Sequence, residues 1–475
     1  MFNSIQEFYN ILPLVIIGSG IILSVFIEVY SQKSESFLPW FSLLIFLSTA
    51  FYSLLTIANE SVVLQNMIST GGRTNLFYFI FNIGAALVCL LSVDYTKKYG
   101  MNYGEYYILI QSSVLGMMLM AGAKNLFMIF LGLEIMSICF YVLAGVNRKK
   151  EKAIEASLKY FLLGAFATGF LVYGIALIYG SAQTTSIDAI TAGFSQLSTN
   201  IIFLVGILLF LIGFSFKIAA FPFHMWVPDV YQGAPTTVTG LFSTIGKASA
   251  FAAIIATLTA LFSGEHQTLF LPYLSVLSVF SMLFGSIVAI AQNNIKRMLA
   301  YSSISHAGYI LIGLASGTSF GVAGVIFYVA VYTFMNLAAF GIVSLIEGEN
   351  DTNLDLNSYS GLGSKSPFLA AMLSLIMFSL AGIPPLAGFF AKYYVFIAAI
   401  KSGLTWLAIL GILSSVISVY FYLRIVVLMY FREPDQNVET AKSFSGMVAV
   451  IISVLLVIIL GIIPGSLLDL ITPYL

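Results

Sequence analysis

Residues 201–235 of this chain read IIFLVGILLFLIGFSFKIAAFPFHMWVPDVYQGAP, and they indicate the kind of fold it adopts. The stretch begins as an apolar run suited to a membrane helix, carries Lys217 at the end of that run, and is then interrupted by Pro222, Pro228 and Pro235. Proline removes a backbone donor and clashes with the preceding turn. A lysine at bilayer depth costs several kcal/mol unless it faces protein or water. The stretch therefore predicts a discontinuous transmembrane helix beside an ion pathway.

The composition predicts an all-α polytopic membrane protein. Of the 475 residues, 60% are hydrophobic and 8% are charged, and apolar runs of about 20 residues recur along the chain. The mean hydropathy is +1.00. The 20 basic and 20 acidic side chains balance, so we expect no nucleic-acid partner. The first residues lack a basic segment and a small-residue cleavage site, so we expect the first span to be retained.

The charges favour about 14 transmembrane helices with both chain termini on the non-cytoplasmic side. Basic loops tend to stay in the cytoplasm, and this arrangement places 12 basic residues in inward loops against 3 in outward loops. The predicted spans are 9–30, 37–57, 76–94, 104–122, 125–146, 156–180, 201–232 (interrupted), 236–262, 270–291, 297–316, 319–346, 366–400 (interrupted), 403–431 and 444–470. The inward residues are Lys33, Lys97, Lys98, Arg148, Lys149, Lys150, Lys152, Lys296, Arg297, Lys365, Arg432 and Lys442, and the outward ones are Arg73, Lys124 and Lys401.

A second interruption, SLAGIPPLAGFFAKYY at 379–394, places Pro384 and Pro385 about two turns before Lys392. Each break falls in the fourth helix of a five-helix group, at 104–262 (helices 4–8) and 270–432 (helices 9–13). Because five crossings reverse the side of entry, the groups should form two inverted repeats. With three N-terminal helices in 1–103 and a C-terminal helix in 444–475, we expect one integral membrane domain, 1–475.

Glu134 and Lys217 form the natural pair of opposite charges, since each lies near the middle of its span. A buried acid and base that lie close together can hold or release a proton as a neighbouring charge changes, which a proton relay requires. A static ion pair that fixes packing is the alternative. It leaves the other intramembrane lysines unexplained.

Further ionisable residues lie within the predicted spans. Lys247 is mid-span with no acid evident nearby, which implies a hydrated axis, and Lys392 follows the second break. His306, in YSSISHAGYILIGLA, lies among hydroxyl side chains, where a neutral imidazole can donate and accept a proton; a satisfied core histidine is the alternative. Lys159 begins its span, and its amino group could instead snorkel to the cytoplasmic interface.

The remaining chemistry is limited. Cys89 and Cys139 lie singly in apolar spans, which excludes iron–sulfur ligation and CxxCH haem attachment. The sequence contains neither a phosphate loop nor a convincing dinucleotide fingerprint, so we expect no cofactor in this chain. His224, after the first break, is expected to cap freed carbonyls, and His266 to be solvated.

Two patterns carry a family resemblance: PFHxWxPDxxxxAP at 222–235 and GxPPxxGFxxK at 382–392. With them the chain resembles the antiporter-like membrane subunits of NADH–quinone oxidoreductase (respiratory complex I), and most closely the subunit N branch. The resemblance covers nearly the whole chain and is strongest over 104–262.

The resemblance implies a proton-translocating, non-redox subunit of the membrane arm, in the bacterial inner (plasma) membrane. NADH, FMN, iron–sulfur clusters and quinone would lie in partner subunits, and the other contacts would be with lipid. A subunit of a sodium/proton antiporter without a redox partner is the alternative, which lysine at 392 does not exclude. The relay that the resemblance implies consists of Glu134 paired with Lys217, the central Lys247, the terminal Lys392, and further positions at Lys159 and His306.

Overall fold

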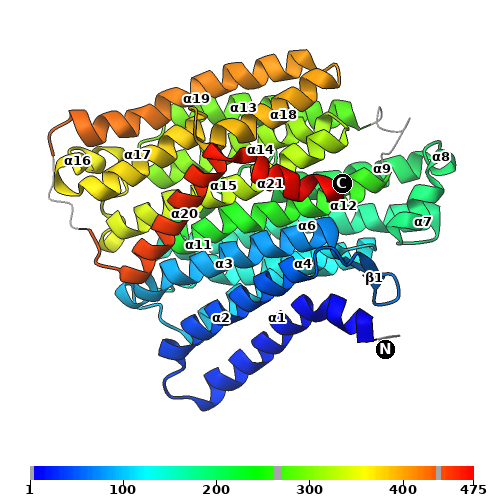
Figure 1. Ribbon diagram of the computed structural model, residues 1–475, viewed down its shortest axis with the longest axis horizontal. Helices are drawn as coiled ribbons and strands as arrows, with labels where there is room; N and C mark the ends of the chain where they lie inside the picture. The colour runs from blue at the N-terminus through cyan, green and yellow to red at the C-terminus, as the bar shows by residue number, and fades with distance from the viewer. Residues whose placement is uncertain (1–4, 262–269, 435–439) are drawn as a thin grey trace.

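The computed structural model describes residues 5–261, 270–434 and 440–475, which form a helical bundle (Figure 1). In this part of the chain, eleven helices are long and apolar enough to cross a membrane, and α9 (Ile201–Lys217) and α17 (Pro367–Ala381) are shorter apolar helices. The prediction of an all-α polytopic membrane protein is confirmed. His266 and the predicted boundary at 262 lie outside the described residues.

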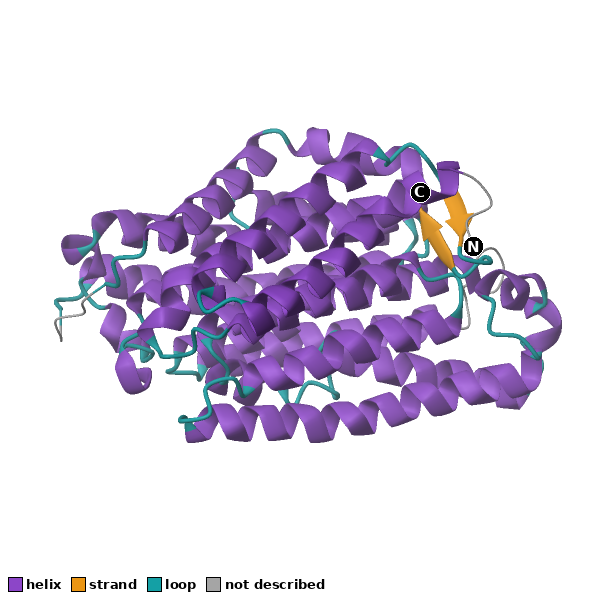
Figure 2. Ribbon diagram, turned by 90° about the horizontal axis from the view of Figure 1, so that it is seen from below, coloured by secondary structure: helices purple, strands orange, loops and turns teal. Residues whose placement is uncertain are grey.

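Three helices form the N-terminal part: α1 (Ile5–Tyr30), α2 (Ser34–Leu55) and α3 (Gly72–Lys98). Between α2 and α3 the chain forms an antiparallel hairpin of β1 (Ser61–Val63) and β2 (Ile68–Thr70). Helix α2 packs between α1 and α3. The hairpin and the C-terminal end of the chain lie at the same end of the bundle (Figure 2).

Two groups of helices follow. The first contains α4 (Gly104–Gly122), α5 (Leu126–Ala144), α6 (Glu151–Ala182), the short connecting helices α7 (Ile187–Ala192) and α8 (Phe194–Leu197), then α9, α10 (Val227–Gly233), α11 (Thr236–Leu241), the π-helix η1 (Phe242–Gly246) and α12 (Lys247–Leu261). The second contains α13 (Leu271–Ile290), α14 (Ile295–Ala315), α15 (Ser319–Ile346), the short η3 (Glu349–Asp351), η4 (Leu356–Tyr359) and α16 (Leu362–Lys365), then α17, α18 (Ala387–Lys401) and α19 (Thr405–Phe431).

Helices pack in the same order in both groups. The first helix packs against the second, the second against the third, and the third against both halves of the broken fourth; the first also packs against the fifth. Two copies of one five-helix unit would produce this shared order. The inverted relationship of the groups and the total of 14 spans stay predictions.

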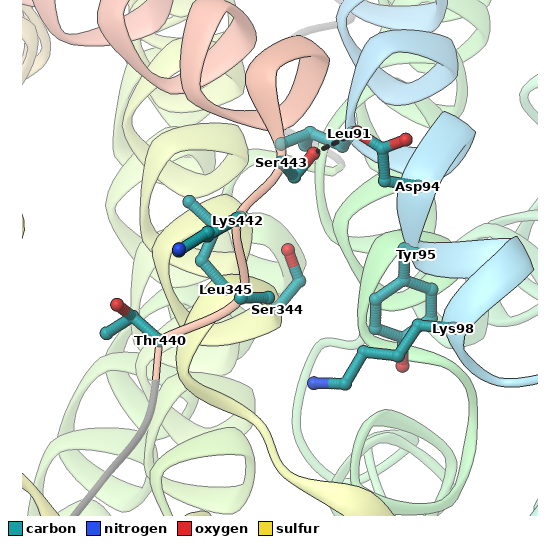
Figure 3. A pocket seen from close by; sticks show the side chains of 10 residues that line it. Leu91, Asp94, Tyr95, Lys98, Ser344, Leu345, Thr440, Lys442 and Ser443 are labelled. Carbon is teal, nitrogen blue, oxygen red and sulfur yellow. Dashed lines mark hydrogen bonds between the residues drawn. The ribbon is translucent and has the colours of Figure 1, made fainter.

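Helix α20 (Phe444–Ile462) connects the N-terminal part to the second group, because it packs against both α3 and α15. The carboxylate of Asp94 on α3 accepts hydrogen bonds from Ser443 Oγ at 2.7 Å and Ser445 Oγ at 3.2 Å (Figure 3 shows the first). The chain then ends in α21 (Pro464–Ile471) and η5 (Thr472–Tyr474).

Glycines set the closest helix crossings in the first group. A Cβ placed on Gly116 of α4 would lie 2.5 Å from the carbonyl oxygen of Gly132 on α5, and the reverse distance is 2.6 Å. Gly174 of α6 and Gly206 of α9 meet in the same way, at 2.6 and 3.0 Å. Small residues allow membrane helices to approach closely, and here larger side chains would push the backbones apart.

Both predicted breaks are present, and their free carbonyls have partners. Helix α9 ends at Lys217, and Trp226 Nε1 donates to the carbonyl of Phe216 at 3.2 Å. Helix α17 ends at Ala381, and Gly382 has a φ of 90°, a conformation that favours glycine. The prediction that His224 caps the first break is wrong: its ring stacks on Phe221, and within the described chain its buried Nδ1 has no partner.

Candidate functional site

Lys217, the last residue of α9, is buried against α5 and α6. Its Nζ donates to Ser137 Oγ at 2.7 Å and to Tyr141 OH at 3.4 Å, both on α5. The same nitrogen lies 5.3 Å from the ring centre of Tyr141 and 5.6 Å from that of Tyr160. Helix α9 ends at Lys217, at the first break. The break therefore places the amino group of Lys217 against α5 and α6.

Glu134 and Lys217 do not touch in this structure, and their predicted role as a relay pair stays a prediction. No ion pair joins them among the described residues, and Glu134 Oε1 is buried without a hydrogen-bond partner there. Ser137, one turn along α5 from Glu134, occupies the place of the acid. Its hydroxyl donates to the carbonyl of Leu133 at 2.5 Å, so it accepts from Lys217. Ser137 lies in no recognisable sequence motif, so the sequence alone could not identify it as the partner of Lys217.

Lys247 is the first residue of α12 and follows the π-helix η1 directly. Its Nζ donates to the carbonyl oxygen of Ser303 at 2.6 Å and to its hydroxyl at 2.5 Å. The ring centre of Tyr332 lies 5.9 Å away. No ion pair to Lys247 occurs among the residues that the structure describes. A π-turn displaces the helix by one residue and often marks a functional site.

His306 is buried in α14 with both ring nitrogens engaged. Nδ1 lies 2.8 Å from Tyr328 OH, and Nε2 lies 3.0 Å from Tyr422 OH. The hydroxyl of Tyr422 also bonds that of Ser302. A neutral imidazole donates through one nitrogen and accepts through the other, so the two tyrosines fill both roles.

Lys392, on the second half of the second broken helix, closes that break. Its Nζ donates to the carbonyl of Ala381 at 2.9 Å and to Ser415 Oγ at 2.8 Å. It also lies 4.9 Å from the ring centre of Tyr309, whose hydroxyl bonds Ser414 at 3.1 Å. The lysine therefore satisfies a carbonyl that the proline interruption leaves free.

Helix α14 brings two of the lysines and the histidine together. Ser303, His306 and Tyr309 follow one another at three-residue spacing, which places them along one face of the helix. Ser303 binds Lys247, and Tyr309 lies beside Lys392. We call these five residues the buried row. They come from α12, α14 and α18, which are distant in the sequence.

Lys159 lies apart from the buried row. Its Nζ pairs with Glu155 and with Asp229, each at 2.7 Å, and Asp229 also pairs with Arg297 at 2.7 Å. The side chain of Lys159 is 41% exposed. These ion pairs join α6 to α10 and α14, which agrees with the snorkelling alternative. They do not test the relay role.

The buried lysines and the two broken helices are typical of membrane proteins that contain an ion pathway. The family of transmembrane proteins described as "NADH:quinone oxidoreductase/Mrp antiporter" matches residues 123–418. The NADH-quinone oxidoreductase subunit N of Trichlorobacter lovleyi is 44% identical to this chain over 464 residues, covering 96% of the chain and 93% of that relative. The chain belongs to the subunit N branch of this family, and the predicted resemblance is confirmed.

Two solved structures share the fold. A chain of respiratory complex I from Thermus thermophilus with bound aureothin has a TM-score of 0.82 at 30% identity, covering 97% of this chain and 99% of that one. A chain of the Mrp complex from Dietzia sp. DQ12-45-1b has a TM-score of 0.87 at 20% identity, covering 99% and 96%. The second likeness concerns the fold alone, so the sequence favours the complex I relationship over the antiporter alternative.

Proposed function

We propose that this chain is a proton-translocating, non-redox subunit of a membrane-bound NADH–quinone oxidoreductase. Membership of the subunit N branch supports this function. In this proposal, partner subunits of the membrane and peripheral parts hold NADH, FMN, iron–sulfur clusters and quinone, and this chain moves protons as quinone is reduced. The chain lies in the bacterial inner membrane with both termini on the non-cytoplasmic side.

The buried row is the observation that carries the proposal. An amine of lysine, a hydroxyl of serine or tyrosine, and an imidazole can each accept a proton at one moment and donate one at another. Along α14 these groups follow one another from Lys247 to Lys392. A purely structural core would place apolar side chains at such positions, because buried amines are costly in a membrane.

Glu134 and Lys217 supply a switch for this row. Glu134 has an unpartnered buried oxygen, and Lys217 is bonded to a hydroxyl one turn away on the same helix. A small movement of the lysine side chain from Ser137 toward Glu134 would create an ion pair that is absent now. That movement would change the electrostatic potential at the next lysine. We expect a conformational change in a partner subunit to affect proton binding in the buried row by this route.

Purification from native membranes tests the assignment. We expect the chain to co-isolate with flavin-containing and iron–sulfur subunits, in a complex that reduces quinone. Co-isolation with other antiporter-like subunits alone, together with sodium-dependent proton movement in vesicles, would favour the sodium/proton antiporter and contradict the proposal.

A further inference from the structure

A cavity of about 510 Å³ opens on the predicted cytoplasmic side. Its walls come from the end of α3, the connection between α5 and α6, the joint between α10 and α11, and the end of α15. Lys150, before α6, and Lys152, in the first turn of α6, pair with Asp351 across this cavity. A second cavity, of about 350 Å³, shares Tyr95 and Lys98 of α3 with it, and Figure 3 shows these two side chains.

Glu347, the residue that directly follows α15, lines the first cavity and is only 1% exposed. Its Oε2 accepts hydrogen bonds from Thr236 Oγ1 at 2.5 Å and Tyr95 OH at 3.0 Å. Its main-chain carbonyl accepts from Lys98 Nζ at 2.7 Å and Tyr99 OH at 2.9 Å. No ion pair to this carboxylate occurs among the residues the structure describes.

A second buried ionisable side chain, Lys296, lies close enough to this carboxylate to interact with it electrostatically. Lys296 is fully buried, and its Nζ donates to the carbonyl of Ala234 at 2.7 Å, two residues before Thr236. The prediction that Lys296 is a cytoplasmic loop residue is wrong, because it lies in the first turn of α14. Ser303 follows it by seven residues, two turns along the same face, so α14 leads from Lys296 to the buried row.

A structural role alone does not account for a carboxylate at this position. An amide or a hydroxyl oxygen would accept from Tyr95 and Thr236 equally well, without the cost of burying an acid that makes no direct ion pair. Tyr99, outside the spans, does not compete for protons. Burial, and then the carboxylates of Glu347, Asp351 and Glu349, raise the pKa of its phenol, which stays protonated. The titratable and charged groups around Glu347 are Tyr95 and Lys98 of α3 and Tyr99 after it, Lys149 and Lys150 before α6, Glu151 and Lys152 at the start of α6, Lys296 of α14, and Glu349, Asp351 and Tyr359 after α15.

We propose that Glu347 is the residue through which protons enter from the cytoplasmic cavity and pass toward Lys296 and Lys247. The inference rests on the proposed function and adds its point of entry. The carboxylate takes a proton from water in the cavity and becomes a neutral acid. It then releases that proton inward, by way of the Thr236 hydroxyl or water, to the neutral amine of Lys296. The amine becomes an ammonium and the carboxylate is restored.

Glu347→Gln tests the entry role, because glutamine keeps an oxygen for Tyr95 and Thr236 but takes up no proton. In the whole complex in membrane vesicles, we expect near-normal assembly and proton translocation lowered about a hundredfold or more, the scale of a lost proton-transfer group. Glu349→Gln is the matched control: it removes an exposed carboxylate from the same cavity and should translocate normally. Normal translocation by Glu347→Gln would overturn the inference.

Two further variants distinguish a failure of the entry role from a failure of the proposed function. Lys247→Ala, assayed in the same vesicles, tests the proposed function: if Lys247→Ala is inactive and Glu347→Gln is active, only the entry role fails, whereas activity in both contradicts the proposed function. If Glu347→Gln does not assemble, Glu347→Asp decides, because it keeps a carboxyl group that is one methylene shorter. The entry role requires an assembled Glu347→Asp complex to retain proton translocation, since its carboxyl group still takes up a proton, and loss of translocation in that complex overturns it.

Discussion

Ser303 holds the amino group of Lys247 through two oxygens, its carbonyl at 2.6 Å and its hydroxyl at 2.5 Å. The contact joins the first turn of α12, directly after the π-helix, to the middle of α14. Neither oxygen is charged, so the lysine can lose its proton without leaving a buried anion behind. This relationship makes Lys247 the best single residue for testing proton translocation.

Lys247→Ala should lower proton translocation about a hundredfold or more, because the buried row loses the titratable group at one of its ends. In a tightly coupled complex, electron transfer should fall with it. Lys247→Arg should restore little, because the guanidinium does not deprotonate. Translocation and quinone reduction are measured in the same vesicles, with Lys33→Ala, at an exposed position, as the control. Normal translocation per electron in an assembled Lys247→Ala complex would rule out the relay role.

The double variant Glu134→Gln/Lys217→Met distinguishes a switch from architecture. Because Lys217 is bonded to Ser137 rather than to Glu134, and Ser137 keeps its bond to the Leu133 carbonyl, we expect the variant to assemble nearly normally. Proton translocation should nevertheless be strongly reduced, since neither position titrates. Complex content and proton uptake are to be determined in one vesicle preparation. An active double variant would show that the two residues only maintain shape.

Variants of Lys159 distinguish a structural role in ion pairs from a role in the proton relay. Lys159→Arg keeps the positive charge for Glu155 and Asp229, whereas a relay at this position needs a group that deprotonates. If the ion pairs are its whole role, Lys159→Arg should translocate normally. Lys159→Met should then cost about 1 kcal/mol or less of stability, as exposed ion pairs do. Loss of translocation in an assembled Lys159→Arg complex would establish the relay role instead.

The topology predicts opposite sides for two connections. A single cysteine introduced in 147–155 should react from the cytoplasmic side with an impermeant reagent, and one in 181–200 from the other side. The wild-type cysteines, Cys89 and Cys139, are buried and provide the background control. Labelling of both introduced cysteines from the same side would contradict the 14-span arrangement.

Hydropathy and proline placement predicted the helical membrane fold and the two breaks, and both were correct. The reason is local: an apolar helix in lipid needs no distant partner to form, and proline interrupts it wherever it occurs. Lys217, Lys247, Lys392 and His306 were recognisable for the same reason, because a polar group inside an apolar run is conspicuous without knowledge of its neighbours. The sequence motifs around Pro222 and Pro384 also indicated the protein family.

The partners of these groups emerged only in three dimensions. Ser137, Ser303 and Ser415 look like any serine in a membrane helix, where the hydroxyl commonly bonds its own backbone one turn back. Whether such a hydroxyl instead meets a lysine depends on how helices distant in the sequence cross. Glu347 and Lys296 escaped detection because each lies at a helix end, where span boundaries read from hydropathy are least certain. Their burial depends on packing between α3, α11, α14 and α15, which hydropathy does not encode.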